Sequence, residues 1–333
     1  MSVGWNTIES DAGVFTYLLD NLGVKDVQFE ELLDLDADSL AQLHPLYGVI
    51  FLFKFPTDAP YRGTGGEPPD GTYDHDAAEH MFFATQTIQN ACGTQALLSV
   101  LLNQTAADAA PEHAAVDLGP ALGAFRDFAM VLPPDMRGEA LSNAQLIRTV
   151  HNSFARSSPF ADETARQADD AAGAEDAFHF VAYTAVRGRL YELDGLQPAP
   201  ISHGPCDGAG FPGRVVEVLR RRVARYDAAE IRFNLLAVCR DLRVRARELG
   251  DAELLAREER KRRGWQLENA LRRHNFVGFA GEVLQGVVRM KLEEGDGAYE
   301  KWVGAATEKM KKRIQEKQGK GGGGRGEHVE MGG

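Results

Sequence analysis

The segment FFATQTIQNACGTQALLSV, residues 82–100, places a cysteine where a polar turn meets an apolar helical pattern. The turn ends at Cys92, and the residues from there to Val100 have the spacing of a packed helix. A thiol at a helix N-terminus lies beside unpaired backbone N–H groups and the positive end of the helix dipole, which favour the thiolate. Cys92 is therefore a candidate nucleophile, with a space-filling buried cysteine as the plainer alternative.

The other two cysteines indicate packing rather than chemistry. Cys239 ends an alternating apolar series, which predicts the core face of a strand over residues 230–240. Cys206 lies in a loop with no second sulfur nearby in the sequence. Because no pair of cysteines has the spacing of metal ligands, we do not expect a zinc site. We also expect no other metal and no cofactor.

A β-hairpin further along the chain offers a base and a group to orient it. Aromatic and β-branched residues over 177–186 and 189–195 flank the short turn Arg187-Gly188. With these two residues at the turn, His179 and Asp194 are diagonal neighbours on one face of the sheet. A carboxylate so placed can accept the imidazole N–H and stabilise the imidazolium. A surface His–Asp pair is the alternative interpretation.

Two further residues bear on this chemistry. Gln86, six residues before Cys92, can present its amide to an oxyanion, with the Cys92 backbone N–H as a second donor. A lone loop glutamine is otherwise usually solvated. His151 lies on a helical stripe and rivals His179 as the base, but no carboxylate is placed to orient it, so capping or packing is favoured.

These residues lie in segments that resemble the ubiquitin C-terminal hydrolases, a family of papain-like cysteine proteases that remove ubiquitin. The segments are residues 5–18, 48–55, 82–100, 151–156, 176–181, 190–196 and 230–236. The resemblance implies an α+β papain-like fold with a central, mainly antiparallel sheet flanked by helices. It also implies the roles of four residues: Cys92 as nucleophile, His179 as general base and acid, Asp194 as the orienting residue and Gln86 as the oxyanion donor.

The resemblance continues beyond the catalytic region. Residues 265–269 (WQLEN) and 272–276 (RRHNF) are similar to the C-terminal domain of the proteasome-associated members of the family. Gly278 departs from this pattern, in which the relatives carry proline. The resemblance implies a helical C-terminal extension that docks on a proteasomal ubiquitin receptor, and a chromatin-remodelling complex is a further possible partner. Helices that fold back on the catalytic domain are the alternative.

We therefore expect a catalytic domain over residues 1–240, a helical regulatory or partner-docking domain over 241–320, and a disordered glycine-rich tail over 321–333. The charge-rich residues 243–263 predict a long solvated helix supported by surface pairs such as Glu258–Arg262. Residues 157–176 have few large apolar side chains, which predicts a flexible strap beside His179. The resemblance implies a crossover loop for the ubiquitin tail there, and an ordinary surface loop is the alternative.

The charge is divided unevenly along the chain. Residues 1–213 carry 30 acidic and 10 basic residues, whereas the chain as a whole has a net charge of −12. An acidic catalytic part repels nucleic acid and attracts a basic protein surface, and the resemblance names ubiquitin and ubiquitinated proteins as that partner. The sequence has neither a membrane-length apolar run nor a signal peptide, so we expect the cytoplasm and nucleus and no membrane contact.

The sequence thus predicts a deubiquitinating cysteine protease that hydrolyses the bond after the C-terminal glycine of ubiquitin, acting at the proteasome. Two alternatives stay open. One is an adaptor that binds ubiquitin with little or no turnover. The other is a general papain-like protease acting on unfolded proteins, which a strap over the site would disfavour.

Overall fold

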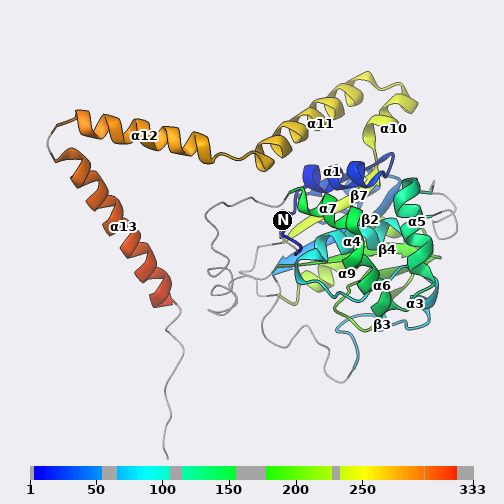
Figure 1. Cartoon of the computed structure of the whole chain (residues 1–333). Coiled ribbons are helices and arrows are strands. Elements are labelled where there is room, and N and C mark those ends of the chain that lie inside the picture. Colours follow the sequence, from blue (N-terminus) through cyan, green and yellow to red (C-terminus); the bar gives the residue numbers. More distant parts are fainter. Residues whose placement is uncertain are drawn as a thin grey trace, which may run out of the picture. The chain divides into compact units, whose positions relative to one another are not determined.

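The computed structural model describes residues 4–54, 66–105, 115–154, 178–226, 233–295 and 297–320. Its centre is a seven-stranded sheet in the order β1-β7-β2-β4-β5-β6-β3, in which every pair of neighbours is antiparallel (Figure 1). The strands are β1 (Val27–Leu32), β2 (Leu46–Lys54), β3 (Thr72–Tyr73), β4 (Phe178–Val186), β5 (Arg189–Leu193), β6 (Ile201–Pro205) and β7 (Asn234–Arg240).

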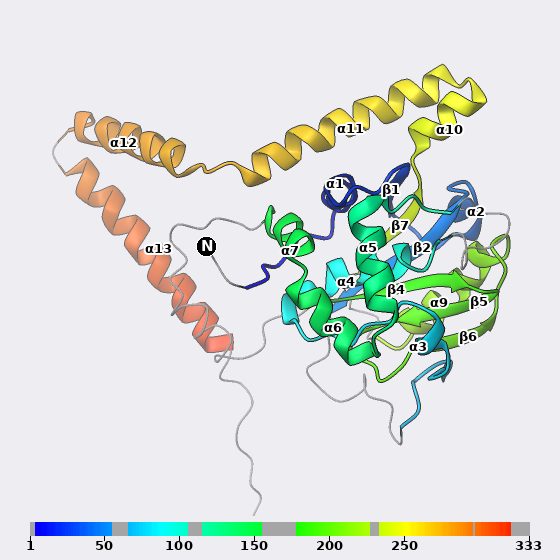
Figure 2. The same cartoon turned by 45° about the vertical axis from the view of Figure 1, so that its right-hand side comes forward.

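Helices cover both faces of this sheet. One face packs against α1 (Ala12–Leu22), α4 (Cys92–Leu101), α5 (Gly119–Met130), α6 (Pro134–Asn143) and α7 (Gln145–Asn152). The other face packs against α2 (Ala37–Ala41) and α9 (Phe211–Val223), as Figures 1 and 2 show. The remaining helices are α3 (Ala77–His80), the 3-10 turn η2 (Gln89–Ala91), α10 (Leu242–Leu249), α11 (Ala252–Arg273), α12 (Val277–Glu293) and α13 (Ala298–Lys320).

Strand β2 shows how the sequence pattern produces two cores. It lies between β7 and β4 and has apolar residues on both of its faces, as a central strand requires. Ile50 belongs to the core under α1 and α4, whereas Phe51 and Phe53 belong to the core under α9. Since successive side chains of a strand point to opposite faces, one continuous apolar run serves both layers.

The β4–β5 hairpin has the predicted register. Val186 pairs with Arg189 and Ala182 with Leu193, so the turn consists of Arg187 and Gly188. Both turn residues have positive φ, 49° and 76°. This is the conformation of a two-residue type I′ turn, which matches the twist of the strands on either side. The turn therefore fixes which residues of β4 face those of β5 and of the segment after it.

One of two neighbouring polar residues, Ser10 and Asp11, caps the first helix. Asp11, rather than Ser10, caps α1, because its Oδ1 atom accepts a hydrogen bond of 2.9 Å from the Val14 amide. The Ser10 hydroxyl instead bonds Asn234. Both side chains can cap a helix, so their order in the sequence does not decide which one does.

The prediction of one long solvated helix over residues 243–263 was wrong. Gly250, with φ of 68°, ends α10 in the left-handed region, and a second helix, α11, follows. Glu258 and Arg262 are buried, with 1% and 7% of their surface exposed. Arg262 pairs with Asp20 and Asp241. Helix α11 therefore lies against the catalytic part of the chain.

The chain divides into two compact units, Met1–His274 and Asn275–Gly333. The division falls at residue 274, rather than at the predicted residue 240, because α11 packs on α1. The predicted strap over 157–176 and the tail over 321–333 lie outside the described residues. Gly278 lies in the first turn of α12, and a Cβ on it would have nothing within 4 Å outside its own helix backbone and chain neighbours. None of the helices that the structure describes has both the length and the apolar content for a membrane crossing.

Candidate active site

The thiol of Cys92 lies at the predicted helix start. Cys92 is the first residue of α4 and is 8% exposed. Helix α4 packs on β4 at this point: a Cβ on Gly93 would lie 3.4 Å from the Phe180 ring. The start of α4, which carries the thiol, therefore lies beside the residue that directly follows His179.

The expectation that the helix start favours the thiolate needs a correction. Burial raises the pKa of the Cys92 thiol, while the backbone amides of Phe180, Gly93 and Cys92 itself lower it. Burial is the larger effect, so the net pKa lies above its ordinary value. In the free protein, Cys92 therefore carries a neutral thiol at neutral pH. Formation of the thiolate requires a proton acceptor beside the sulfur.

His179 and Asp194 form the predicted pair. The Nε2 atom of His179 lies 2.8 Å from Oδ1 of Asp194, and both side chains are almost fully buried. The same Oδ1 atom accepts a hydrogen bond of 3.0 Å from the Leu196 amide. The hairpin places the two residues diagonally, because Ala182 faces Leu193 in the register.

Electrostatics fix the protonation of this pair near neutral pH. Burial lowers the pKa of His179, so its imidazole is neutral. Burial raises the pKa of Asp194 to about 6, so its carboxylate is mostly ionised at pH 7. An ionised carboxylate only accepts hydrogen bonds, so the imidazole hydrogen lies on Nε2. The Nδ1 atom then holds the lone pair that can accept a proton.

Gln86 is joined to the segment that carries Asp194. Its backbone amide donates a hydrogen bond of 2.8 Å to the carbonyl of Gly195. Gln95 of α4 lies at the same place and donates a bond of 2.6 Å to the Ala84 carbonyl. The packing leaves no room for a side chain at Gly195, where a Cβ would lie 2.1 Å from Nε2 of Gln95. Sequence reasoning missed Gln95, since a glutamine within an apolar helix carries no distinct signal.

Arg137 of α6 holds the main chain that leads to Gln86. Its side chain is 1% exposed, and its guanidinium donates to backbone carbonyls that include Ala78, Met81 and Phe83. On the same helix, Gly138 packs so closely that a Cβ would lie 2.0 Å from the carbonyl oxygen of Thr85. A buried guanidinium that satisfies several carbonyls holds a loop at a fixed distance from its helix. The sequence did not reveal this role.

His151 has a packing role, as favoured. Its Nδ1 atom lies 2.7 Å from the Thr94 hydroxyl and its Nε2 atom 2.5 Å from the Asn6 carbonyl, so both ring nitrogens have partners. The ring also contacts Trp5 edge-on, with 4.8 Å between centroids. His151 therefore joins the N-terminal segment to α4.

The remaining cysteines are buried, Cys239 completely and Cys206 with 7% exposed, and both are free thiols. Burial raises the pKa of Cys206 to about 11, so this residue is a poor source of thiolate. Within the described ranges, no cluster of three or more His, Cys, Asp or Glu side chains is arranged to hold a metal ion.

Comparison with known proteins assigns this geometry to a family. The profile described as "Ubiquitin carboxyl-terminal hydrolase, family 1" matches residues 5–224. The chain belongs to the ubiquitin carboxyl-terminal hydrolase family. A second profile, "Ubiquitin carboxyl-terminal hydrolases", matches residues 251–291, which include α11 and most of α12. The protein is thus a deubiquitinating cysteine hydrolase that binds ubiquitin.

Individual relatives extend over nearly the whole chain. Ubiquitin carboxyl-terminal hydrolase 2 of Schizosaccharomyces pombe is 48% identical over 298 residues, covering 88% of this chain and 93% of that protein. The ubiquitin carboxyl-terminal hydrolase ubh-4 of Caenorhabditis elegans is 36% identical and covers 92% of this chain and 94% of that protein. The crystal structure of Trichinella spiralis UCH37 bound to ubiquitin vinyl methyl ester has a TM-score of 0.58 at 32% identity, covering 80% of this chain and 99% of that one.

Proposed function

We propose that Cys92 is the nucleophile of this ubiquitin carboxyl-terminal hydrolase and that His179 and Asp194 activate it. The Nδ1 atom of neutral His179 takes the thiol proton, and the thiolate attacks the carbonyl of the terminal glycine of ubiquitin. Asp194 stabilises the imidazolium that forms. His179 then protonates the leaving amine, and water hydrolyses the thioester with His179 again acting as base.

The oxyanion of the tetrahedral intermediate needs donors that are in place before the reaction. We assign this role to the Gln86 side chain and to the backbone amide of Cys92. The backbone N–H of Gln86 donates a hydrogen bond to the carbonyl of Gly195, the residue after Asp194. This bond supports the assignment, because it fixes the main chain of Gln86 beside the segment that carries Asp194. The Arg137 contacts on the other side of the segment restrict its movement further.

The observation that carries the proposal is the 2.8 Å contact between His179 and Asp194, together with the packing of the start of α4, at Cys92 and Gly93, beside Phe180. Turnover of ubiquitin carrying a C-terminal fluorogenic amide tests it. We expect Cys92→Ser to lose turnover and Cys206→Ala, a matched change at a second buried thiol, to keep it. Ubiquitin binding without turnover by the unaltered chain would favour the adaptor alternative, and cleavage of unfolded casein would favour a general protease.

The C-terminal unit supports a second part of the proposal, recruitment to a large complex. Phe279, Val283 and Met290 are 68%, 49% and 50% exposed, and their spacing of four and seven residues places them on one face of α12. An exposed apolar helix face is a common docking element for a partner protein. We assign it to a proteasomal ubiquitin receptor, with action in the cytoplasm and nucleus, and keep a chromatin-remodelling complex as the second candidate.

Direct binding of the full chain to a purified proteasomal ubiquitin receptor tests the recruitment. We expect Phe279→Asp to weaken binding by about a hundredfold, since a charge would replace a central apolar contact. Gln285→Asp adds a charge on another face of α12 and should bind normally. Equal binding by both variants would contradict this docking face, and the same variants test a chromatin-remodelling complex. Fluorescence microscopy of the tagged chain tests the two compartments.

A further inference from the structure

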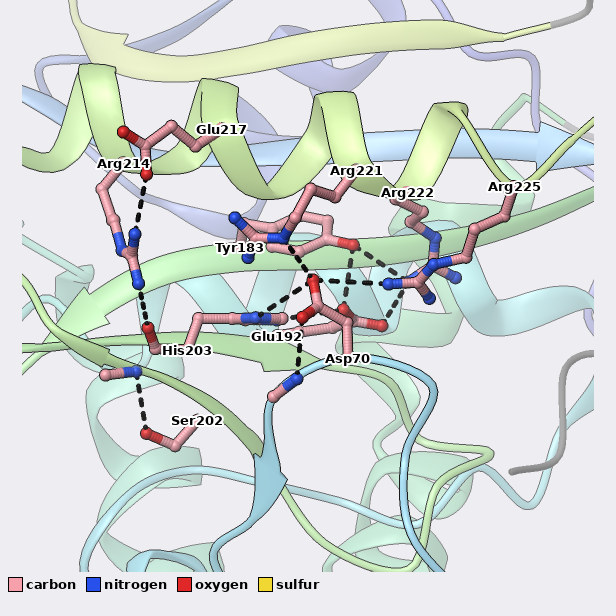
Figure 3. Close-up of polar contacts among 12 residues, drawn as sticks. Asp70, Tyr183, Glu192, Ser202, His203, Arg214, Glu217, Arg221, Arg222 and Arg225 are labelled. Carbon is pink, nitrogen blue, oxygen red and sulfur yellow. Dashed lines mark hydrogen bonds and ion pairs between the residues drawn. The ribbon is translucent and has the colours of Figure 1, made fainter. Parts of the chain in front are cut away.

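A buried arginine lies on the same face of the sheet as the catalytic pair. Helix α9 carries three consecutive arginines at 220–222, and Arg222 is the buried one, with 7% of its side chain exposed. Figure 3 shows Arg222 reaching from α9 to the sheet, where it pairs with Glu192 and donates a hydrogen bond of 2.9 Å to the Tyr183 hydroxyl. Its guanidinium carbon also lies 4.6 Å from the centre of the Phe53 ring.

Glu192 is a second buried carboxylate beside Asp194. It faces Tyr183 in the register, and Asp194 follows two residues later in the chain. Residues two apart on an extended chain point to the same face, with Cα atoms roughly 7 Å from each other. The two residues are 6% and 1% exposed. The site therefore contains two carboxyl groups, both shielded from water.

The contacts form a continuous layer from Arg222 to the base. The Phe53 ring under the guanidinium meets the His179 imidazole edge-on, at 5.9 Å between centroids and 89° between planes. On the other side, Glu192 accepts a hydrogen bond of 3.0 Å from the Tyr183 hydroxyl, and its Oε2 atom lies 3.3 Å from Nε2 of His203. A charge on Arg222 or Glu192 therefore acts on the catalytic pair through protein rather than through solvent.

We propose that Arg222 is a positioning residue for the hydrolytic reaction. Its positive charge neutralises Glu192 through their ion pair. Asp194 then stays ionised and can stabilise the imidazolium of His179. Without this cation, two shielded carboxylates would repel each other, and one of them would take up a proton at neutral pH. A protonated Asp194 would lose the charge that stabilises the imidazolium. The inference rests on the roles proposed above for His179 and Asp194.

The pKa values follow this arrangement. Burial raises the pKa of Glu192, but the attraction of Arg222 and the bond with His203 outweigh burial and bring it to about 2. Burial raises the pKa of Asp194, and the Leu196 amide and Arg222 oppose that rise. Besides burial, Arg222 lowers the pKa of His179 and Glu192 raises it, so the two charges oppose each other at the base.

Other titratable groups surround the catalytic pair, and a pH profile must be interpreted with them in view. They are Cys92 at the start of α4, Tyr183 on β4, Glu192 on β5, His203 on β6, Arg222 on α9 and Tyr226 just after α9. Asp70 lies beside His203 and forms two outer ion pairs, one with Arg221 and one with Arg225 (Figure 3).

The test is the pH profile of kcat/KM between pH 5 and 9.5 for the full chain on a fluorogenic ubiquitin amide. We expect Arg222→Gln to move the acidic limb to higher pH by about one unit, which is a tenfold loss at a pH on that limb. Glu192→Gln removes a neighbouring negative charge and leaves Arg222 uncompensated, both of which favour ionised Asp194, so it should move the acidic limb to lower pH. The double variant Arg222→Gln/Glu192→Gln removes both charges and should return the acidic limb toward that of the unaltered chain.

Controls separate this role from a structural one. Arg220→Gln makes the same change on an exposed neighbour and should leave the acidic limb in place. Two results would overturn the inference. One is a kcat/KM of Arg222→Gln that is lower by the same factor at every pH. The other is a double variant whose pH profile has its acidic limb at the same pH as that of Arg222→Gln. If Arg222→Gln does not fold, the acidic limbs of Glu192→Gln and of the double variant are compared instead, and equal limbs would overturn the inference. Full turnover by Cys92→Ser would refute the proposed function instead.

Discussion

The ring of Trp265 lies directly on the backbone of Gly13: a Cβ on this glycine would be 2.6 Å from the Trp265 Cγ atom. Beside it, Asn269 donates a hydrogen bond of 2.9 Å to the Gly13 carbonyl. Helix α11 therefore reaches the main chain of α1, and the absence of a side chain at Gly13 permits that approach. The sequence assigned the segment around Trp265 to the docking of a partner protein. In the structure, Trp265 and Asn269 instead contact α1 of the same chain.

Gly13→Ala tests the docking of α11. The added methyl group must displace a tryptophan ring, which costs about 1–3 kcal/mol in a packed interface. We expect a lower melting temperature and faster amide hydrogen exchange in α11. Gly264→Ala is the control, because a Cβ there has nothing within 4 Å and should stabilise the helix by about 0.5–1 kcal/mol. Equal stability of Gly13→Ala and the unaltered chain would refute the contact.

The raised pKa of Asp194 predicts a pH dependence of turnover. Since burial brings this pKa to about 6, the carboxylate is charged above that pH and gains a proton as the pH falls through it. Loss of the charge removes support for the imidazolium, so kcat/KM should decrease about tenfold per pH unit below the midpoint. A profile that stays flat from pH 7 to pH 5 would contradict this assignment.

Asp194→Asn separates activity from stability. An amide cannot stabilise the imidazolium, so we expect kcat/KM to fall by about 10² to 10⁴. The folded-state pKa of Asp194 lies above its ordinary value, so the charged form opposes folding at pH values above that pKa. The variant should thus melt at an equal or higher temperature at pH 8. A large loss of stability with unchanged kcat/KM would reverse the assigned role.

His151→Gln distinguishes the two candidate bases. Both ring nitrogens of His151 hold structural contacts, so the variant should lose about 1–3 kcal/mol of stability by leaving a buried group unpaired. Its kcat/KM on a fluorogenic ubiquitin amide should stay within a few-fold of the unaltered chain. His179→Gln should lose turnover instead. The opposite result for the two variants would make His151 the base.

Gly195→Ala tests the link between Asp194 and the oxyanion segment. The new Cβ would meet Nε2 of Gln95 at 2.1 Å and Cβ of Gln86 at 2.9 Å, so the segment must shift. A displacement of about 1 Å at a catalytic group can cost a hundredfold in rate. We expect a loss of that order in kcat/KM, with ubiquitin binding retained. Gly213→Ala on α9, with open space around it, is the matched control.

The hairpin register could be predicted because local sequence determines it. Two residues at the turn, Arg187 and Gly188, set the pairing of both strands, and so the sequence alone placed His179 beside Asp194. The start of α4 at Cys92 was predictable for the same reason, since the polar turn and the apolar helix adjoin. The pKa of the thiol was not, because burial depends on segments distant in the sequence.

Buried ion pairs were the main features that the sequence did not reveal. Arg222 stands in a run of three arginines that resembles a solvated surface, and Glu258 and Arg262 have the spacing of an exposed helical pair. The sequence nevertheless contained an indication that Arg222 is buried. Arg222 has the helical spacing that places it on the same face of α9 as the buried residues Val215, Val218 and Leu219.

Covalent trapping with ubiquitin vinyl methyl ester, followed by peptide mapping of the adduct, tests the central claim most directly. The account predicts one ubiquitin adduct per chain, located on Cys92, and strongly reduced labelling of His179→Ala at neutral pH. An adduct on Cys206 or Cys239, or undiminished labelling of Cys92→Ala, would contradict it.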